Sequence, residues 1–475
     1  MTNESTVPPE SGTATLHSFS RNAVGVRAGT TAADSTHAYG VEAKRVDCDW
    51  ARNTQLTDGV EELFAAHRRR NESQPSRYWY PLSRPTYGVE EVVEALDSLC
   101  SFRTSMGEKT RMFERQFAAF QRCSDSVMVN SGSSADLLLC FLLTNPLRPL
   151  LQPGDEILVP VVTWPTQLWS AMMAGLKVRL VDVDPATLNV DLDDLESEIT
   201  PATRAIFVVH LMGNPCRMDR VLELARQHNL IVIEDCCEAL GAEWDGVPVG
   251  NFGLGGSFSF FFSHHITTME GGMITCPDAE TADQLRILRA HGWLRNVDPA
   301  TFRLADDELD PRYAFINWGF NVRPTEVQAG FGLHQLEKLP AFNRRRDILA
   351  GRFFDFVDHL PCFTRPVVHP LARPSWLALP VLVRPDAPFS RREITTFLEQ
   401  NGVETRPIVA GNLAKQPAAK LFGLDGGNFP GADEIHWQGF YVGLSPMQDD
   451  QGFDRLLDLI HGFVHSKTAR RAIAA

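Results

Sequence analysis

Small polar residues separate an apolar run from a helical run near position 130. The apolar run ends at Val129 and the helical run contains Leu137-Leu138-Leu139, and between them stands Asn130-Ser131-Gly132-Ser133-Ser134. Backbone N–H groups at a helix N-terminus, helped by serine hydroxyls, bind phosphate groups well. The segment therefore indicates either a phosphate site or an ordinary helix N-cap, and its residues alone do not separate the two.

A carboxylate and an indole follow two other apolar runs. Asp235 ends the run Ile231-Val232-Ile233-Glu234, and Trp164 stands after Val162-Thr163. A buried acid at the end of a strand needs a cationic partner, and a protonated pyridine nitrogen would serve. Trp164 could lie flat on the ring of such a cofactor. The structural alternatives are a helix N-cap for Asp235 and a core position for Trp164.

Two adjacent histidines stand where a third apolar segment ends. His264 and His265 follow Phe258-Ser259-Phe260-Phe261-Phe262-Ser263. Imidazole titrates near neutral pH, so a histidine can carry protons in a reaction. It has no primary amine, however, and cannot form an imine with an aldehyde. The chain holds seven lysines against 38 arginines, and none of the lysines lies between residues 178 and 337.

The expected elements place these side chains at one edge of a sheet. Apolar runs at residues 157–159, 178–181, 205–209 and 230–233 alternate with amphipathic segments. Such alternation is typical of a largely parallel sheet with helices on both faces, whose ligands bind beyond the carboxyl ends of the strands. We also predict helices over 56–71, from 112 to 120 and around 333–342.

Length and composition bound the domain organisation and the class of partner. The 475 residues suffice for a large domain and a second, smaller one. We expect a disordered extension at 1–46, a helical segment at 47–110, a large domain at 111–345, a small domain at 346–463 and a tail at 464–475. The formal charge of −14 argues against nucleic acid or an anionic membrane as the main partner.

The sequence also indicates where the protein works. No apolar run approaches the length of a membrane span, and the N-terminus lacks the layout of a signal peptide. Nine scattered cysteines, an odd number, favour reduced thiols over disulfides. We therefore expect a cytoplasmic protein.

The chain resembles the DegT/DnrJ/EryC1/StrS sugar aminotransferase family over about residues 78–463. The resemblance rests on the order and spacing of all these segments, together with His265-Ile266-Thr267-Thr268-Met269-Glu270-Gly271-Gly272. The resemblance implies the α/β fold of PLP-dependent transferases of fold type I, as in aspartate aminotransferase. This fold has a mixed, mostly parallel sheet and a smaller C-terminal α+β domain. It also implies a homodimer that uses pyridoxal 5'-phosphate or pyridoxamine 5'-phosphate.

The resemblance assigns roles to residues of this chain. Ser133, Ser134 and Ser259 would hold the cofactor phosphate. Trp164 would stack on the ring and Asp235 would pair with the pyridinium. The segment Gly319-Phe320-Asn321-Val322-Arg323 is similar to a loop that reaches the neighbouring subunit's cofactor, so Asn321 would act across the dimer interface.

One departure from the family pattern decides the expected function. The aminotransferases carry a cofactor-binding lysine at the position where this chain has His264. The histidine points to the histidine-containing 3-dehydratase branch of the family, and Arg406-Pro407-Ile408 strengthens that match. One type in this branch, the dehydrases of CDP-4-keto-6-deoxyglucose, holds a two-iron cluster on four cysteines. Here Cys237 matches the first of them, but no cysteine follows His291-Gly292-Trp293. The chain therefore resembles the iron-free type, the dehydratases of GDP-4-keto-6-deoxymannose.

We accordingly expect removal of the C3 hydroxyl of a nucleotide-linked 4-keto-6-deoxy sugar, with L-glutamate regenerating the amine form of the cofactor. His264 would move the protons. His291 would contact the sugar or support the leaving group, unless it is a core histidine, and His265 is structural. Arg406 would bind the glutamate carboxylate or sugar phosphates, with a surface ion pair as the alternative. The rival functions are an iron–sulfur dehydrase, an aminotransferase that recruits a distant lysine, and a non-catalytic binding protein.

Overall fold

The computed structural model describes residues 54–72, 77–297 and 309–474. The extension expected at 1–46 lies outside the described residues. None of the helices within the described ranges is both long enough and apolar enough to cross a lipid bilayer.

A seven-stranded sheet of mixed direction forms the centre of the fold. Its strands lie in the order β1 (Asp125–Val129), β9 (Gly272–Cys276), β8 (Gly256–Ser259), β5 (Ile231–Asp235), β4 (Thr203–Val209), β2 (Glu156–Pro160) and β3 (Lys177–Val181). The strands from β8 to β3 are parallel to one another, whereas β9 runs antiparallel to both neighbours. The four apolar runs of the sequence are four of these strands, and the expected mixed, mostly parallel α/β sheet is confirmed.

The direction of the strands brings distant segments to one edge of the sheet. Because β1, β8, β5 and β2 all run the same way, the residues after them meet at the carboxyl edge. Almost every residue of β2 and β4 is buried, as expected of strands that helices cover on both faces. The helices that follow the strands are α4 (Gly132–Leu143), α5 (Thr166–Met173), α6 (Leu192–Ser197), α7 (Met218–His228) and α8 (Ala279–Arg289).

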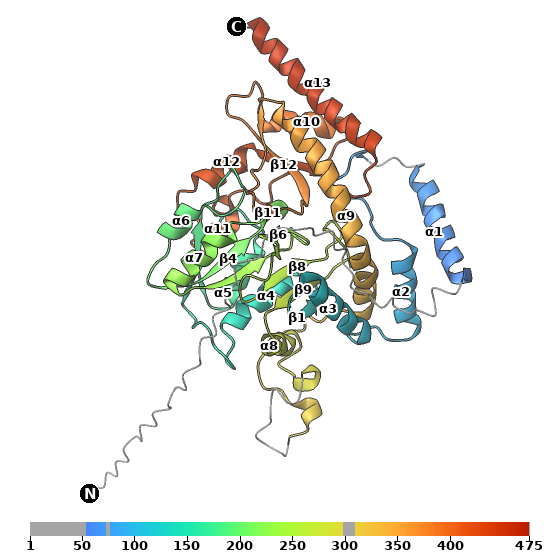
Figure 1. The fold of residues 1–475 in the computed structure, drawn as a ribbon, viewed down its shortest axis with the longest axis vertical. Helices are drawn as coiled ribbons and strands as arrows, with labels where there is room; N and C mark the ends of the chain where they lie inside the picture. The colour runs from blue at the N-terminus through green and yellow to red at the C-terminus, as the bar shows by residue number, and fades with distance from the viewer. Residues whose placement is uncertain (1–53, 73–76, 298–308, 475) are drawn as a thin grey trace, which may run out of the picture. The chain divides into compact units, whose positions relative to one another are not determined.

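A long helix, α9 (Glu326–Asp358), connects the sheet region to the C-terminal region. Thr325 and Gln328 form a capping box at its start. It packs against α2 (Val89–Cys100) and α3 (Glu108–Gln121), and α2 packs against α1 (Thr54–Glu72) (Figure 1). The predicted helices over 56–71, 112–120 and 333–342 are parts of α1, α3 and α9. The expected domain boundary at 345/346 falls inside α9, and the division into segments stays a prediction.

The C-terminal region has its own antiparallel sheet. Its strands lie in the order β10 (Phe363–Thr364), β12 (Ala378–Val383), β14 (Gly439–Gly443) and β13 (Thr405–Pro407). Its helices are α10 (Arg391–Gln400), α11 (Pro417–Leu421), α12 (Pro430–Gln438) and α13 (Asp450–Ala474). A small third sheet has the order β11 (Ala372–Arg373), β6 (Glu243–Trp244) and β7 (Val247–Pro248). The pairing of β11 with β6 ties this region to the segment after β5.

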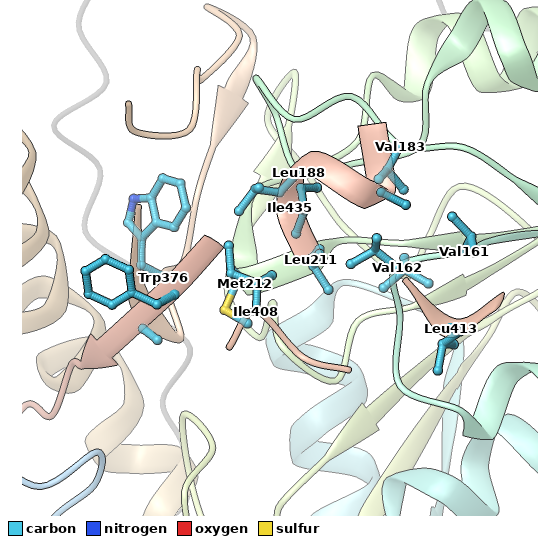
Figure 2. Packing of buried hydrophobic residues seen from close by; sticks show 14 of the residues in the cluster. Val161, Val162, Val183, Leu188, Leu211, Met212, Trp376, Ile408, Leu413 and Ile435 are labelled. Carbon is cyan, nitrogen blue, oxygen red and sulfur yellow. The ribbon is translucent and has the colours of Figure 1, made fainter. Parts of the chain in front are cut away.

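One apolar cluster joins the C-terminal region to the carboxyl edge of the large sheet. Figure 2 shows Ile408 and Ile435 of the C-terminal region near Leu211 and Met212, which follow β4. Leu413 lies near Val161, and its backbone N–H donates to the Val161 carbonyl oxygen at 3.0 Å. These contacts place the segment after β13 beside the residues that follow β2 and β4.

Polar contacts strengthen the same junction. The Asp182 carboxylate, just after β3, accepts the first free N–H groups of α12 from Gly431 and Ala432, both at 2.8 Å. A carboxylate at a helix N-terminus satisfies donors that the helix itself cannot bond. The C-terminal region is therefore held over the strand ends by both apolar packing and a helix cap.

Glu326 generates a prediction about stability. Its buried carboxylate accepts N–H groups from Gly107, Lys109 and Thr110 at the start of α3, at 2.7, 2.8 and 3.0 Å. We expect Glu326→Ala to lower the free energy of unfolding by about 2–3 kcal/mol, because three helix-end donors lose their acceptor. Urea unfolding of the variant measures this loss.

Two further variants complete that experiment. Glu326→Gln should lose less stability than Glu326→Ala, since the amide oxygen still accepts. Glu108→Ala removes an exposed carboxylate of the same helix and serves as the control. A loss in Glu326→Ala no larger than that in the control would contradict the capping role.

Candidate active site

The N-terminus of α4 packs against the end of β8. Ser131 caps the helix by accepting the Ser134 N–H at 3.1 Å. A Cβ on residue 132 would lie 2.6 Å from Ser259 Cβ and 2.9 Å from Cys237 Sγ, so only glycine permits this approach. The structure thus brings the serines of the 131–134 segment and Ser259 to one helix N-terminus, where N–H groups and hydroxyls can bind an anion.

The hydroxyls of this cradle are also oriented by neighbours. Ser134 Oγ donates to Asn130 Oδ1 at 2.6 Å. Ser133 Oγ lies 3.1 Å from Thr166 Oγ1 at the start of α5. Ser259 Oγ accepts the Phe261 N–H at 3.3 Å. All three predicted serines therefore lie at the N-terminus of α4 or against it.

Asp235 ends β5 and is only 6% exposed. Its Oδ1 accepts the Cys237 N–H at 2.8 Å, and its Oδ2 contacts the amide of Gln167. No arginine or lysine of the described residues forms an ion pair with Asp235. Burial raises the pKa of Asp235, and a bound cation would oppose that rise. The site therefore fits a protonated ring nitrogen, which would supply the missing positive charge.

A second acid, Asp136, lies beside Asp235. The Gln167 amide nitrogen that contacts Asp235 also lies 3.4 Å from Asp136 Oδ2, and Ser257 Oγ donates to Asp136 Oδ1. Burial and the charge of Asp235 raise the pKa of Asp136 well above its ordinary value. Two buried carboxyls within 4.8 Å of each other do not readily ionise together, so we expect Asp136, whose pKa is raised well above its ordinary value, to hold the proton and Asp235 to carry the charge. Sequence reasoning missed Asp136, although an acid within an apolar helix was a usable signal.

His264 lies in the loop between β8 and β9, close to the segment after Asp235. Its Nδ1 lies 2.7 Å from the Cys237 carbonyl oxygen, so Nδ1 must carry a hydrogen. Burial lowers the pKa of His264, and the charge of Arg346 lowers it further. The ring is therefore neutral near pH 7, and Nε2 has a lone pair that no described residue engages. A histidine in this state can accept a proton.

The His265 side chain is directed into the protein interior. It is fully buried, and its Nε2 donates to the Ser375 carbonyl oxygen at 2.9 Å. Burial lowers the pKa of His265 well below its ordinary value, so it stays neutral. This contact fits the structural role expected for His265.

Three predicted site residues lie on the surface and make no contact with His264 within the described chain. Trp164 is 59% exposed beyond the end of β2. His291 and Asn321 are also exposed, and their segments pair with each other: the His291 N–H donates to the Phe320 carbonyl oxygen at 2.8 Å. The neighbouring Val322 accepts the Asn130 N–H at 3.0 Å, so this surface lies next to the serine cradle.

Arg406 lies on β13, opposite Tyr441 on β14. Its guanidinium donates to the Glu404 carboxylate at 2.7 Å. This contact is the surface ion pair expected from the sequence as the alternative to substrate binding. Burial and the charge of Glu238 raise the pKa of Tyr441 to about 12, while Arg406 acts in the opposite direction. Tyr441 therefore lies within electrostatic reach of Arg406 and of Glu238, which is three residues beyond Asp235.

The described lysines and cysteines bear on the two rival chemistries. Lys177 and Lys420 are exposed, and Lys109, Lys338, Lys415 and Lys467 form ion pairs with other carboxylates. No described lysine bonds to His264 or Asp235. The groups of possible metal ligands within the described ranges are His210 with Glu234 and Cys236, and Asp136 with Asp235 and Cys237. Neither contains four cysteines, and the iron-free site stays a prediction.

Glu238 generates a prediction about pH. Burial raises the pKa of its carboxyl from 4.5 to about 7. Between these values the folded state binds more protons than the unfolded state, so the free energy of unfolding falls as the pH rises. Glu238→Gln should remove this fall, and its stability relative to the unsubstituted protein should be greater at about pH 8 than at about pH 5.

Urea unfolding at the two pH values checks this expectation. Glu280→Gln, at an exposed position of α8, should shift stability equally at both pH values. If Glu238→Gln also behaves equally at both, the carboxyl is not the buried group that the structure shows.

Comparisons with known proteins find relatives that are similar over most of this chain. A GDP-4-keto-6-deoxy-D-mannose 3-dehydratase of Yersinia pseudotuberculosis is 36% identical over 386 residues, covering 80% of this chain and 98% of the relative. A dTDP-4-dehydro-2,6-dideoxy-D-glucose 3-dehydratase of Saccharopolyspora spinosa is 32% identical over 453 residues, covering 90% of this chain and 98% of the relative. A crystal structure of GDP-4-keto-6-deoxymannose-3-dehydratase with a trapped PLP-glutamate geminal diamine has a TM-score of 0.76 and 35% identity, covering 80% of this chain and 99% of that chain.

A family model also matches most of the sequence. It is described as the DegT/DnrJ/EryC1/StrS aminotransferase family, and it spans residues 85–460. This range contains the serine cradle, Asp235, His264 and Arg406. The chain therefore belongs to the DegT/DnrJ/EryC1/StrS aminotransferase family.

Proposed function

We propose that this protein is a pyridoxal-phosphate-dependent lyase of deoxysugar biosynthesis that removes the C3 hydroxyl of a nucleotide-linked 4-keto-6-deoxy sugar. The observation that carries the proposal is His264: a neutral imidazole with a free Nε2 stands where the family's aminotransferases carry lysine. The two similar relatives, both 3-dehydratases, support it.

The overall reaction balances with L-glutamate as the second substrate. The sugar and glutamate give the 4-keto-3,6-dideoxy sugar, 2-oxoglutarate and ammonia. Glutamate supplies two electrons and the nitrogen that leaves, so no external reductant is needed. The structure with a PLP-glutamate adduct in a similar enzyme supports glutamate as the donor.

The residues of the site fit pyridoxal phosphate. The α4 N-terminus with Ser133, Ser134 and Ser259 holds its phosphate, and Asp235 keeps its ring nitrogen protonated. Trp164 covers one face of the ring. A cofactor held there in its amine form would supply the amine for the C4 ketone and a ring that withdraws electrons from the bonds that break.

His264 moves the protons in both halves of the reaction. Its Nε2 accepts the proton from glutamate Cα and delivers it to the C4′ carbon of the cofactor. In the sugar half it takes that proton back and, now charged, protonates the departing C3 hydroxyl. The hydrogen bond from Nδ1 to the Cys237 carbonyl oxygen keeps the ring in the tautomer that frees Nε2.

A second subunit completes the site. Asn321 and His291 lie exposed beside the serine cradle, together with Trp318, which is also exposed. We assign this surface to a homodimer in which Asn321 reaches the partner's cofactor and His291 contacts sugar. Arg406 binds the glutamate carboxylate or the sugar phosphates from the C-terminal region. We place the enzyme in the cytoplasm, where nucleotide sugars are made.

A substrate panel tests the function. The full-length protein receives pyridoxal phosphate, glutamate and one of the GDP-, dTDP-, CDP- or UDP-linked 4-keto-6-deoxy sugars. Equal amounts of ammonia and 4-keto-3,6-dideoxy sugar, without iron or reductant, are the expected products. An amino sugar as the product, or a requirement for iron, would contradict the proposal.

His264→Lys should convert the chemistry. A lysine there can bind the cofactor aldehyde covalently, so borohydride treatment should leave the cofactor attached to the chain. We expect C3 deoxygenation to fall at least about 100-fold, because the proton carrier is lost. Mass spectrometry of the products measures this fall.

The control for this experiment is His461→Lys, on an exposed position of α13. It should keep full deoxygenation activity and bind no cofactor covalently. Undiminished deoxygenation in His264→Lys would show that the proton carrier lies elsewhere.

The two acids should respond differently to the same change. Asp136→Asn replaces a neutral acid by an amide of the same shape, so cofactor affinity should change less than about threefold. Asp235→Asn removes the charge opposite the ring nitrogen and should weaken binding at least about tenfold. A cofactor titration followed by absorbance gives both affinities. Equal losses in the two variants would contradict the assignment of the proton to Asp136.

A further inference from the structure

Arg346 is a buried cation without a counter-ion. It lies on α9 and is 2% exposed. Its NH1 and NH2 groups donate to the carbonyl oxygens of His265 and His264 at 3.3 and 3.4 Å. Its Nε has no protein partner in the part of the chain that the structure describes, and no carboxylate there forms an ion pair with it.

Such a residue weakens the fold. Arg346 makes only long hydrogen bonds to carbonyls, and the Asp347 carboxylate acts on it electrostatically without forming an ion pair. Burying a charge in this way costs free energy, and apolar replacements of buried charges are often neutral or stabilising. Burial lowers the pKa of Arg346 to about 9, so the guanidinium is still charged at neutral pH. Stability does not account for this arginine, and its contacts show what it does instead.

Both contacts of Arg346 are made with the loop that carries His264. The same face of α9 presents Asn343, whose amide donates to the Leu240 carbonyl oxygen at 3.2 Å. Ser375 Oγ donates to that same oxygen, and the Ser375 carbonyl accepts from His265. The histidine loop, the segment after Asp235 and the start of the C-terminal region therefore meet at this part of α9.

The charges around the His264 ring have a defined distribution. Arg346 faces it from α9, next to Asp347, whose carboxyl is in turn influenced by Arg373. From the segment after β5 comes the Cys237 carbonyl oxygen, and from its own loop comes His265. Of the titratable groups, Arg346 acts directly on the pKa of His264 and opposes its protonation.

We propose that Arg346 is a positioning residue for His264: its guanidinium holds the His264 and His265 carbonyls of the loop, so that the imidazole is fixed with Nε2 free to act as a base. This inference rests on the proposed function for its consequence in catalysis. The state of the His264 ring, however, can be measured without any substrate.

The test measures the titration of His264 directly. The rate at which diethyl pyrocarbonate modifies His264, followed by peptide mass mapping over a range of pH, reports the pH at which the ring becomes neutral. In Arg346→Met, a neutral side chain of similar length, this pH should rise by about one unit. The melting temperature should stay equal to that of the unsubstituted protein or rise.

Two further variants make the result specific. Arg345→Met removes the adjacent arginine, which forms an ion pair with Asp450 at 3.1 Å and does not contact the His264 loop through that pair. This variant should leave the titration of His264 unchanged. Arg346→Gln is neutral but still donates to a carbonyl, and it should show the same upward shift. It also provides the measurement if the methionine variant does not fold.

The outcomes separate this proposal from the proposed function. An unchanged titration in a folded Arg346 variant, or a lowered melting temperature with no shift, would overturn the role of Arg346. Absence of deoxygenation in the substrate panel would overturn the function and leave the titration result intact. With active enzyme, the acid limb of the pH–rate profile of the glutamate half-reaction should shift upward by the same amount as the titration.

Discussion

The hydrogen bond between His264 Nδ1 and the Cys237 carbonyl oxygen joins the two halves of the candidate site. Cys237 lies two residues beyond Asp235, whose carboxylate accepts the Cys237 N–H. One short segment after β5 therefore orients both the acid that would face the cofactor ring and the imidazole that would carry protons. Because the bond uses the Nδ1 hydrogen, it also selects the tautomer whose Nε2 is free, and the proposed chemistry depends on that choice.

The site concentrates polar groups that are costly to bury. No arginine or lysine of the described chain forms an ion pair with Asp235, the pKa of Asp136 beside it is raised, and Arg346 forms no ion pair with a described carboxylate. Each raises the free energy of the folded chain, and each is held in place by the surrounding packing. A cofactor with a protonated ring nitrogen would compensate Asp235, so cofactor binding and folding should reinforce each other.

The C-terminal region contributes mainly by its position. Apolar contacts of Ile408, Leu413 and Ile435 hold it over the strand ends, and Asp182 caps α12 from the sheet side. Tyr441 thereby comes within electrostatic reach of Glu238, and Arg406 lies opposite Tyr441 on the neighbouring strand. His291 and Asn321, in contrast, lie exposed beside the cradle, and the chain by itself does not bring them to His264.

The sequence by itself determined the sheet, its alternating helices, the family and the residue that replaces lysine, because periodic apolar runs and short motifs are local in the chain. The strands β2 to β5 and the helices α1, α3 and α9 were predictable for that reason. Only the tertiary structure decided that Asp136 shares a buried site with Asp235 and that Arg346 faces the His264 loop. These pairs are separated by about 80 to 100 residues, and they meet through strand order and the course of α9, which no local pattern encodes.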